Sequence, residues 1–85
     1  MKIKIFSIRD SATDQYLNPF GMFAPGQALR FFSDEINRAA GDNQFYNHPD
    51  DFELFQLGEF DTQSGLFECS APISIGTGKN IAVRS

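Results

Sequence analysis

The sequence predicts an α+β fold in which one helix packs across one face of a small, mainly antiparallel sheet. Three segments carry this prediction. Met1–Arg9 alternates as a strand does, Gln27–Ala40 has the spacing of a core-facing helix, and Asn47–Phe67 is typical of a strand, a tight turn and a return strand. The predicted order is β-α-β-β, and a further strand near the C-terminus is left open.

The first predicted strand has two faces of different character. Its odd positions are Ile3, Ile5 and Ser7, and we expect this face to point into the core. Its even positions mix cations with apolar groups, in the series Lys2, Lys4, Phe6 and Ile8. The next segment, Asp10–Ala24, has no sustained period but is rich in large apolar side chains. Such a segment is typical of a functional loop or of a loop packed down as a lid.

The segment Gln27–Ala40 is the clearest helix of the chain, and Pro25 precedes it. Its apolar stripe has the i, i+3, i+7 spacing of a helix that faces a core, with Leu29, Phe32 and Ile36 flanked by Ala28 and Ala39. Phe31 lies off this stripe. We expect Gly41 to end the helix. We also expect ion pairs on its outer face, Arg30–Asp34 and Asp34–Arg38.

The sequence of the second half of the chain predicts a β-hairpin. A turn that begins near Pro49 leads into Phe52–Phe60, which is apolar on both faces and is therefore expected to be a central strand. Asp61–Gly65 has the pattern of a hairpin loop, because Asp accepts hydrogen bonds from turn amides and Gly adopts positive φ. Leu66–Cys69 returns. Short edge strands are expected after Pro72, at Ile73–Ile75 and Ile81–Val83.

Length and composition predict a single domain, residues 1–85, with little room for a core. Ten Phe and two Tyr bury large areas each, and we expect a homodimer that hides further apolar surface. The one cysteine, Cys69, cannot form a disulfide within the chain. The chain begins with no signal-peptide pattern, and no apolar run reaches the roughly 20 residues of a membrane-spanning helix. We therefore expect a soluble intracellular protein.

The net charge of −4 is unevenly distributed. Residues 1–40 carry five cations and four carboxylates, whereas residues 41–85 carry two cations and seven carboxylates. A protein that coats nucleic acid without sequence preference needs several cations near phosphates, so the acidic total argues against that class. A local basic face remains compatible with it.

The residues indicate no catalytic device, and we expect a non-enzymatic protein without metal or cofactor. His48 is close in sequence to Asp50 and Asp51, but a lone His beside Pro is typical of a turn. Cys69, for which His48 is the only available histidine base, is typical of a small buried hydrophobe. The segment 76–79 lacks the spacing of a phosphate-binding loop.

Cations and rings in the first half of the chain favour a nucleic-acid surface. Single-stranded nucleic acid is held by rings that stack on bases and by cations that follow the backbone. The candidate residues are Lys2, Lys4, Phe6 and Arg9 of the first strand, Tyr16, Phe20 and Phe23 of the loop, and Arg30 and Phe31 of the helix. A core position for these rings, or a protein–protein surface, stays open as an alternative.

Carboxylates near the hairpin favour a different kind of partner. A basic protein would dock on them, and its charge would mainly tune association rate and specificity. The candidate residues are Asp50, Asp51, Glu53, Glu59 and Asp61.

Four segments have a distinctive sequence: MKIKIFSIRD at the start, YLNPF from Tyr16, GQALRFFSD from Gly26 and HPDDFELFQLGEFDTQSGLF from His48. Together they resemble the small nonstructural protein of gokushovirus-type microviruses, which are phages with circular single-stranded DNA genomes. The likeness covers roughly residues 1–68, and the hairpin segment is its most specific part.

This resemblance implies a DNA-binding or DNA-synthesis accessory protein that acts in the host bacterial cytoplasm and is absent from the mature virion. It implies a counterpart of the microvirus protein that switches replication from duplex copying to single-strand synthesis coupled with packaging. We therefore expect a non-enzymatic protein that assists single-stranded DNA genome synthesis or packaging by binding DNA. The alternative is an adaptor that docks on the replication initiator or on a host replication protein without contacting DNA.

Overall fold

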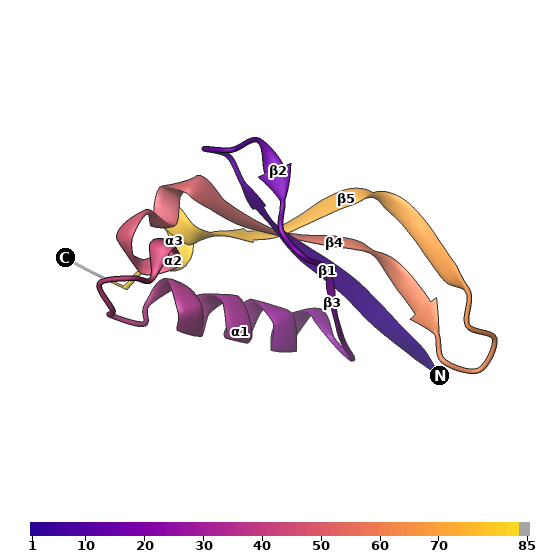
Figure 1. Cartoon of the computed structure of the whole chain (residues 1–85). Coiled ribbons are helices and arrows are strands. Elements are labelled where there is room, and N and C mark those ends of the chain that lie inside the picture. Colours follow the sequence, from indigo (N-terminus) through magenta and orange to yellow (C-terminus); the bar gives the residue numbers. More distant parts are fainter. Residues whose placement is uncertain (84–85) are drawn as a thin grey trace.

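A computed structural model describes residues 1–83 of the chain (Figure 1). Strands precede and follow the main helix, which confirms the predicted α+β class. In chain order the elements are β1 (Lys2–Asp10), β2 (Gln15–Tyr16), β3 (Phe20–Met22), α1 (Pro25–Ile36), α2 (Gln44–Asn47), the 3₁₀ turn η1 (Pro49–Asp51), β4 (Phe52–Asp61), β5 (Phe67–Thr77) and α3 (Gly78–Ile81).

Within residues 1–83 five strands form one antiparallel sheet, in the order β2-β1-β4-β5 with β3 also paired to β1. β4 is an interior strand, as predicted. It carries an extra residue, Leu57, opposite the step from Ile5 to Phe6 of β1, which makes a β-bulge. The next residue, Gly58, has φ +155°, and a Cβ there would overlap the carbonyl oxygen of Glu68. Glycine is therefore required at the bulge.

The helix α1 lies across one face of the sheet, and the core forms between them (Figure 1). The predicted stripe is confirmed at four positions, because Ala28, Phe32 and Ile36 are buried and Leu29 packs against the edge of the core. Its fifth residue, Ala39, lies beyond the end of the helix and is exposed, so that part of the prediction was wrong. Phe31 is exposed, as its position off the stripe predicts.

The prediction that the odd face of β1 points into the core was wrong. The even-position side chains of Phe6 and Ile8 are buried against α1, together with the side chains of β4 at Phe52 and Leu54. These larger side chains fill the space under the helix. On the opposite face Ser7 is also buried, where its hydroxyl donates a 2.6 Å hydrogen bond to the carbonyl of Leu17.

The helix α1 ends at Ile36, four residues before the predicted end, and Asn37 rather than Gly41 caps it. Two asparagine side chains explain this end, because they satisfy carbonyls that a helix terminus leaves free. Asn37 Nδ2 donates to the carbonyls of Ser33 (2.9 Å) and Ile81 (3.1 Å). Asn43 Nδ2 donates to the carbonyls of residues 35 and 38, both at 2.9 Å.

The outer face of α1 carries a different ion pair from those predicted. Arg38 pairs with Glu35 at 3.1 Å. Neither predicted pair of Asp34, with Arg30 or with Arg38, occurs in the part of the chain that the structure describes. Shortening of the helix moves Arg38 out of the helical turn in which the i, i+4 geometry holds.

The segment expected as a loop, Asp10–Ala24, contains the short strands β2 and β3. β2 pairs with the end of β1, at Arg9 and Asp10, and β3 pairs with its middle, from Lys4 to Phe6. The free edge of β1 offers unpaired backbone groups, and these short strands satisfy them. This segment has no regular hydrophobic period, so its pairing with β1 could not be predicted from the sequence.

The hairpin turn is as predicted, but the return strand is longer. Asp61 Oδ1 accepts a hydrogen bond from Gln63 N at 2.9 Å, and Gly65 has φ +76°. β5 then runs through Pro72 to Thr77, and Pro72 lies where the register between β4 and β5 shifts, on a strand with a free edge. The strand expected at Ile81–Val83 is wrong, because the hydroxyl of Thr77 instead caps the short helix α3.

The far end of the hairpin projects beyond α1 (Figure 1). We call it the hairpin end and define it as residues 2–5 and 57–69. The projection makes the molecule elongated, with principal extents of 45 × 23 × 20 Å. Among the helices of residues 1–83, none has the length and apolar character that crossing a membrane requires.

Candidate nucleic-acid interface

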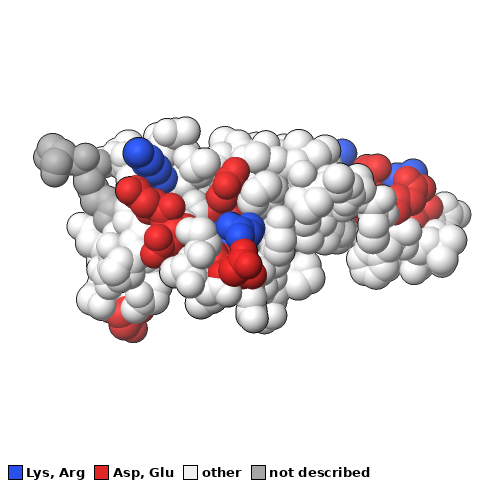
Figure 2. All heavy atoms as spheres, turned by 90° about the horizontal axis from the view of Figure 1, so that it is seen from above, with Lys and Arg blue, Asp and Glu red and all other residues white. Residues whose placement is uncertain are grey.

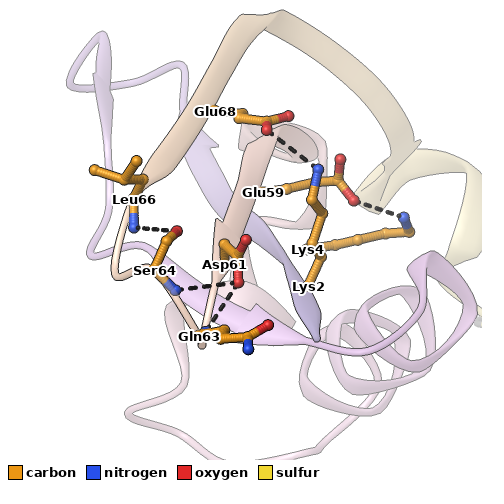
Figure 3. Close-up of polar contacts among 8 residues, drawn as sticks. All are labelled: Lys2, Lys4, Glu59, Asp61, Gln63, Ser64, Leu66 and Glu68. Atoms are coloured by element: carbon orange, nitrogen blue, oxygen red, sulfur yellow. Dashed lines mark hydrogen bonds and ion pairs between the residues drawn. The ribbon is translucent and has the colours of Figure 1, made fainter.

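The two lysines of the predicted surface lie on the hairpin end, where carboxylates neutralise them (Figure 3). Lys2 Nζ lies 3.1 Å from an oxygen of Glu68, and Lys4 Nζ lies 3.4 Å from an oxygen of Glu59. The hydrogen bond and the charge of Glu68 raise the pKa of Lys2. The register of β1 against β4 explains the second pair, because Lys4 lies directly opposite Glu59.

Arg9 does not join the lysines. It lies at the other end of β1 and at an odd position, so its side chain emerges from the opposite face of the strand. There it forms an ion pair with Asp14 of the β1–β2 turn. The three cations of the strand are therefore divided between two faces, and each has a carboxylate partner.

Phe6 is removed from the candidate surface, because its side chain is fully buried in the core. A buried ring cannot stack on a nucleobase, so the prediction that Phe6 contacts DNA was wrong. Its ring instead stacks on Phe20, with centroids 6.0 Å apart, and Phe20 meets Phe31 edge to face at 5.5 Å. This chain of rings connects the core to the outer face of α1 and holds Phe31 in place.

The other predicted rings gather around two adjoining grooves. The first has a volume of about 480 Å³ and is lined by Phe23, Gln27, Arg30, Phe31 and Asp34, among others. The second has a volume of about 570 Å³ and is lined by Tyr16, Leu17, Asn18, Phe20 and Phe31, among others. Phe31 lines both grooves, so they form one continuous surface.

We define the aromatic–arginine surface as Tyr16, Phe20, Phe23, Arg30 and Phe31. Three of its rings are accessible, with exposed fractions of 44% for Tyr16, 59% for Phe23 and 41% for Phe31. Arg30 is exposed and makes no ion pair within residues 1–83, although Asp34 lines the same groove. Within residues 1–83, this surface combines three exposed aromatic rings with one cation, Arg30, that has no ion pair.

Sequence reasoning missed the residue that positions Phe23. Gln27 Oε1 accepts hydrogen bonds from the backbone amides of Phe23 (3.1 Å) and Ala24 (3.3 Å), which orders the segment before α1. A glutamine three residues after the cap position of a helix is the known signal for this contact. Placement of the helix start at Gln27 rather than at Pro25 hid that signal.

The carboxylates of the alternative docking surface fall into two groups. Asp50, Asp51 and Glu53 lie around the start of β4, whereas Glu59 and Asp61 lie at its far end. Eight residues separate Glu53 from Asp61, which corresponds to about 26 Å of strand. Figure 2 likewise shows acidic atoms in separate regions, with cations among them. The structure does not bring the five carboxylates together.

One of these carboxylates has a local role. The backbone amides of Gln63 and Ser64 donate to Asp61 Oδ1, and these hydrogen bonds lower its pKa (Figure 3). Asp61 therefore orders the hairpin turn in its charged form.

The groups that sequence analysis considered for chemistry lie apart. Cys69 is opposite Gly58 in the hairpin, whereas His48 lies just before the start of β4 at Phe52. Cys69 is exposed because it lies on the edge strand β5, so the prediction of a buried cysteine was wrong. Six residues of strand separate Gly58 from Phe52, which corresponds to about 20 Å. Among residues 1–83, no three side chains of His, Cys, Asp and Glu form a group suited to a metal ion.

Comparisons with known proteins give one informative result. Searches of curated proteins and of solved structures found no significant match. The family model described as Phage ORF5 protein matches residues 3–81, which is nearly the whole chain. The chain therefore belongs to the phage ORF5 protein family.

Proposed function

We propose that this phage protein is a non-enzymatic nonstructural protein that assists single-stranded DNA genome synthesis or packaging by binding DNA. It acts in the host bacterial cytoplasm and is not part of the mature virion. Membership of a phage family supports the viral setting, and the sequence resemblance to microvirus proteins supports the role in genome synthesis.

The aromatic–arginine surface is the observation that carries the DNA-binding part of the proposal. Stacking of a base on an exposed ring contributes about 1–3 kcal/mol and tolerates any base, because every base has a flat face. Tyr16, Phe23 and Phe31 present such rings, and Arg30 lines the same groove as Phe23 and Phe31. Together they offer stacking contacts and one cation for the backbone of a single strand.

Fluorescence anisotropy with a labelled oligothymidine at low salt tests the proposal. Phe23→Ala and Phe31→Ala each remove one stacking face, so each should weaken binding by about 5- to 150-fold, the equivalent of 1–3 kcal/mol. Phe23→Tyr and Phe31→Tyr keep a flat ring at the same place and serve as matched controls, with affinity close to that of the unaltered protein. If the alanine variants bind as tightly as the unaltered protein, this surface does not bind DNA.

The same assay separates the proposal from the adaptor alternative. An adaptor that docks on the replication initiator or on a host replication protein does not bind the oligonucleotide even at low salt. In that case the two separate carboxylate groups become the surfaces to test against a basic partner. We favour DNA binding because those carboxylates fall into two separate groups, whereas Phe23, Phe31 and Arg30 line one groove.

A further inference from the structure

The hairpin end has one charged face and one apolar face. Lys2, Lys4 and Glu59 point to the side on which α1 lies, and their charges pair there (Figure 3). The alternating positions Ile3 and Phe60, which lie opposite each other in the register, point to the other side. Figure 2 views the molecule from this other side: charged atoms are visible along one edge of the hairpin end, and the surface between them and the charged region toward the other end is uncharged.

The apolar face of the hairpin end also contains a hollow. We define the hairpin face as Ile5, Leu57, Phe60, Phe67 and Cys69. All of these except Phe60 line a cavity of about 200 Å³, together with Pro19, Gly58, Glu59 and Glu68. The rings of Phe60 and Phe67 lie 4.8 Å apart beside it. Leu66 and Phe67 are 66% and 64% exposed, so two large apolar side chains project beside this apolar cavity.

This exposure is large for a chain of this size. A phenylalanine buries 150–250 Å² when covered, so Phe67 alone leaves about 100–160 Å² of its surface in water. Leu66, which is 66% exposed, enlarges this apolar surface. Contiguous exposed apolar surface is typical of interaction sites. The radius of gyration is 13.4 Å, compared with about 12 Å for a compact domain of 85 residues. The chain thus extends this face away from its own core.

We propose that a second copy of this chain covers the hairpin face, as a two-fold symmetric dimer. The exposed side chains and the cavity lie on the same surface. A two-fold axis through this surface therefore lets each copy place Leu66 or Phe67 in the cavity of the other. The hairpin face itself carries no charged side chain, and the two carboxylates at the cavity, Glu59 and Glu68, are paired with Lys4 and Lys2. Two copies with a net charge of −4 each therefore meet there without unpaired like charges opposed. A basic partner would have to compete with Lys2 and Lys4 for these two carboxylates.

A stable dimer buries roughly 800 Å² on each partner. The hairpin face supplies the apolar centre, and exposed side chains of β5 on the same side of the sheet, such as Ser74 opposite Phe55, supply a rim beside it. Dimerisation would bury apolar surface on the sheet face that α1 leaves uncovered, and a chain of this size buries little surface by folding alone.

Sedimentation velocity of the full chain over a concentration series tests the dimer. We expect a species of twice 9.5 kDa, or 19 kDa. Phe67→Glu puts a charge at the centre of the interface in both copies and should weaken association by about 100-fold or more. Ile73→Glu is the matched control. Ile73 lies on the same strand and is 54% exposed, but it pairs with Gln56 on the face toward α1, so its variant should remain a dimer.

Two results would overturn the proposal: a 9.5 kDa monomer at every concentration, or a dimer that Phe67→Glu leaves intact. Circular dichroism of each variant verifies that it is folded. The single cysteine gives an independent measurement, because iodoacetamide should alkylate Cys69 several-fold more slowly in the dimer than in Phe67→Glu. Equal alkylation rates would place the interface elsewhere. Phe67 is outside the aromatic–arginine surface, so a dimer that fails to bind DNA, or a monomer that binds it, distinguishes the two proposals.

Discussion

Removal of one positive charge at Arg30 should change how DNA binding depends on salt, whereas the same removal at Lys4 should not. Each phosphate contact of a single strand contributes about −0.7 to the slope of log K against log salt concentration. Within residues 1–83, Arg30 is the cation of the aromatic–arginine surface and has no ion pair. The structure therefore predicts a slope of about −0.7 for the unaltered protein.

The patch expected from the sequence would give a different magnitude. If Lys2, Lys4 and Arg9 acted together with Arg30, four contacts would give a slope of about −2.8. Between 50 and 200 mM salt, affinity would then fall by about 50-fold, compared with about 3-fold for one contact. The ion pairs with Glu68, Glu59 and Asp14 favour the smaller value, because each must break before its cation reaches a phosphate.

Anisotropy titrations over a salt series measure these slopes. Arg30→Gln and Lys4→Gln each change the net charge from −4 to −5, so the pair controls for the overall charge. Arg30→Gln should bring the slope close to zero and weaken binding, and Lys4→Gln should leave the slope unchanged. A slope near −3 that Lys4→Gln reduces would refute the reasoning and would restore the basic face of β1 as the DNA site.

Two further predictions concern the fold. Asn43→Ala removes three hydrogen bonds of a buried side chain, two to carbonyls near the end of α1 and one from Phe45 N at 3.1 Å. We expect it to lower the free energy of unfolding by about 3 kcal/mol, which corresponds to a decrease of about 12–24 °C in Tm. Asn47→Ala, which removes one exposed bond, is its control in thermal unfolding, and equal Tm values would contradict the capping role. The pKa of Asp61 is lowered in the folded state, so its contribution is present above the ordinary value of 3.8 and is lost as pH falls through the folded pKa. Asp61→Asn should therefore show a smaller loss of stability in acid than the unaltered protein, and identical acid profiles would contradict this.

Local pattern sufficed for the elements whose period or turn chemistry is strong. The stripe of α1 at Phe32 and Ile36, the central strand β4 and the turn closed by Gly65 agree with the structure. Helical spacing and turn residues report forces that act within a few residues of the chain. Element ends were less predictable. Asn43, seven residues after Ile36, satisfies carbonyls near the end of α1, and no local pattern at Ala40 reveals that contact.

The candidate site was partly predictable. Phe23, Arg30 and Phe31 were named from the sequence and line one groove, but Phe6 and the three cations of β1 were assigned to the same surface and do not belong to it. Alternation along β1 indicates two faces but does not say which one a helix covers. That choice depends on the size of the side chains that meet α1 across the sheet.

The sequence by itself determined that this is a small, acidic, Phe-rich α+β chain with a helix, a hairpin and a likeness to phage proteins. Only the tertiary structure decided which rings are exposed and which cations are neutralised. The physical reason is that exposure and ion pairing depend on strand register and on packing between distant segments. Lys4 meets Glu59 across 55 positions of sequence, and Phe31 meets Phe20 only because α1 lies on the face where β3 presents that ring.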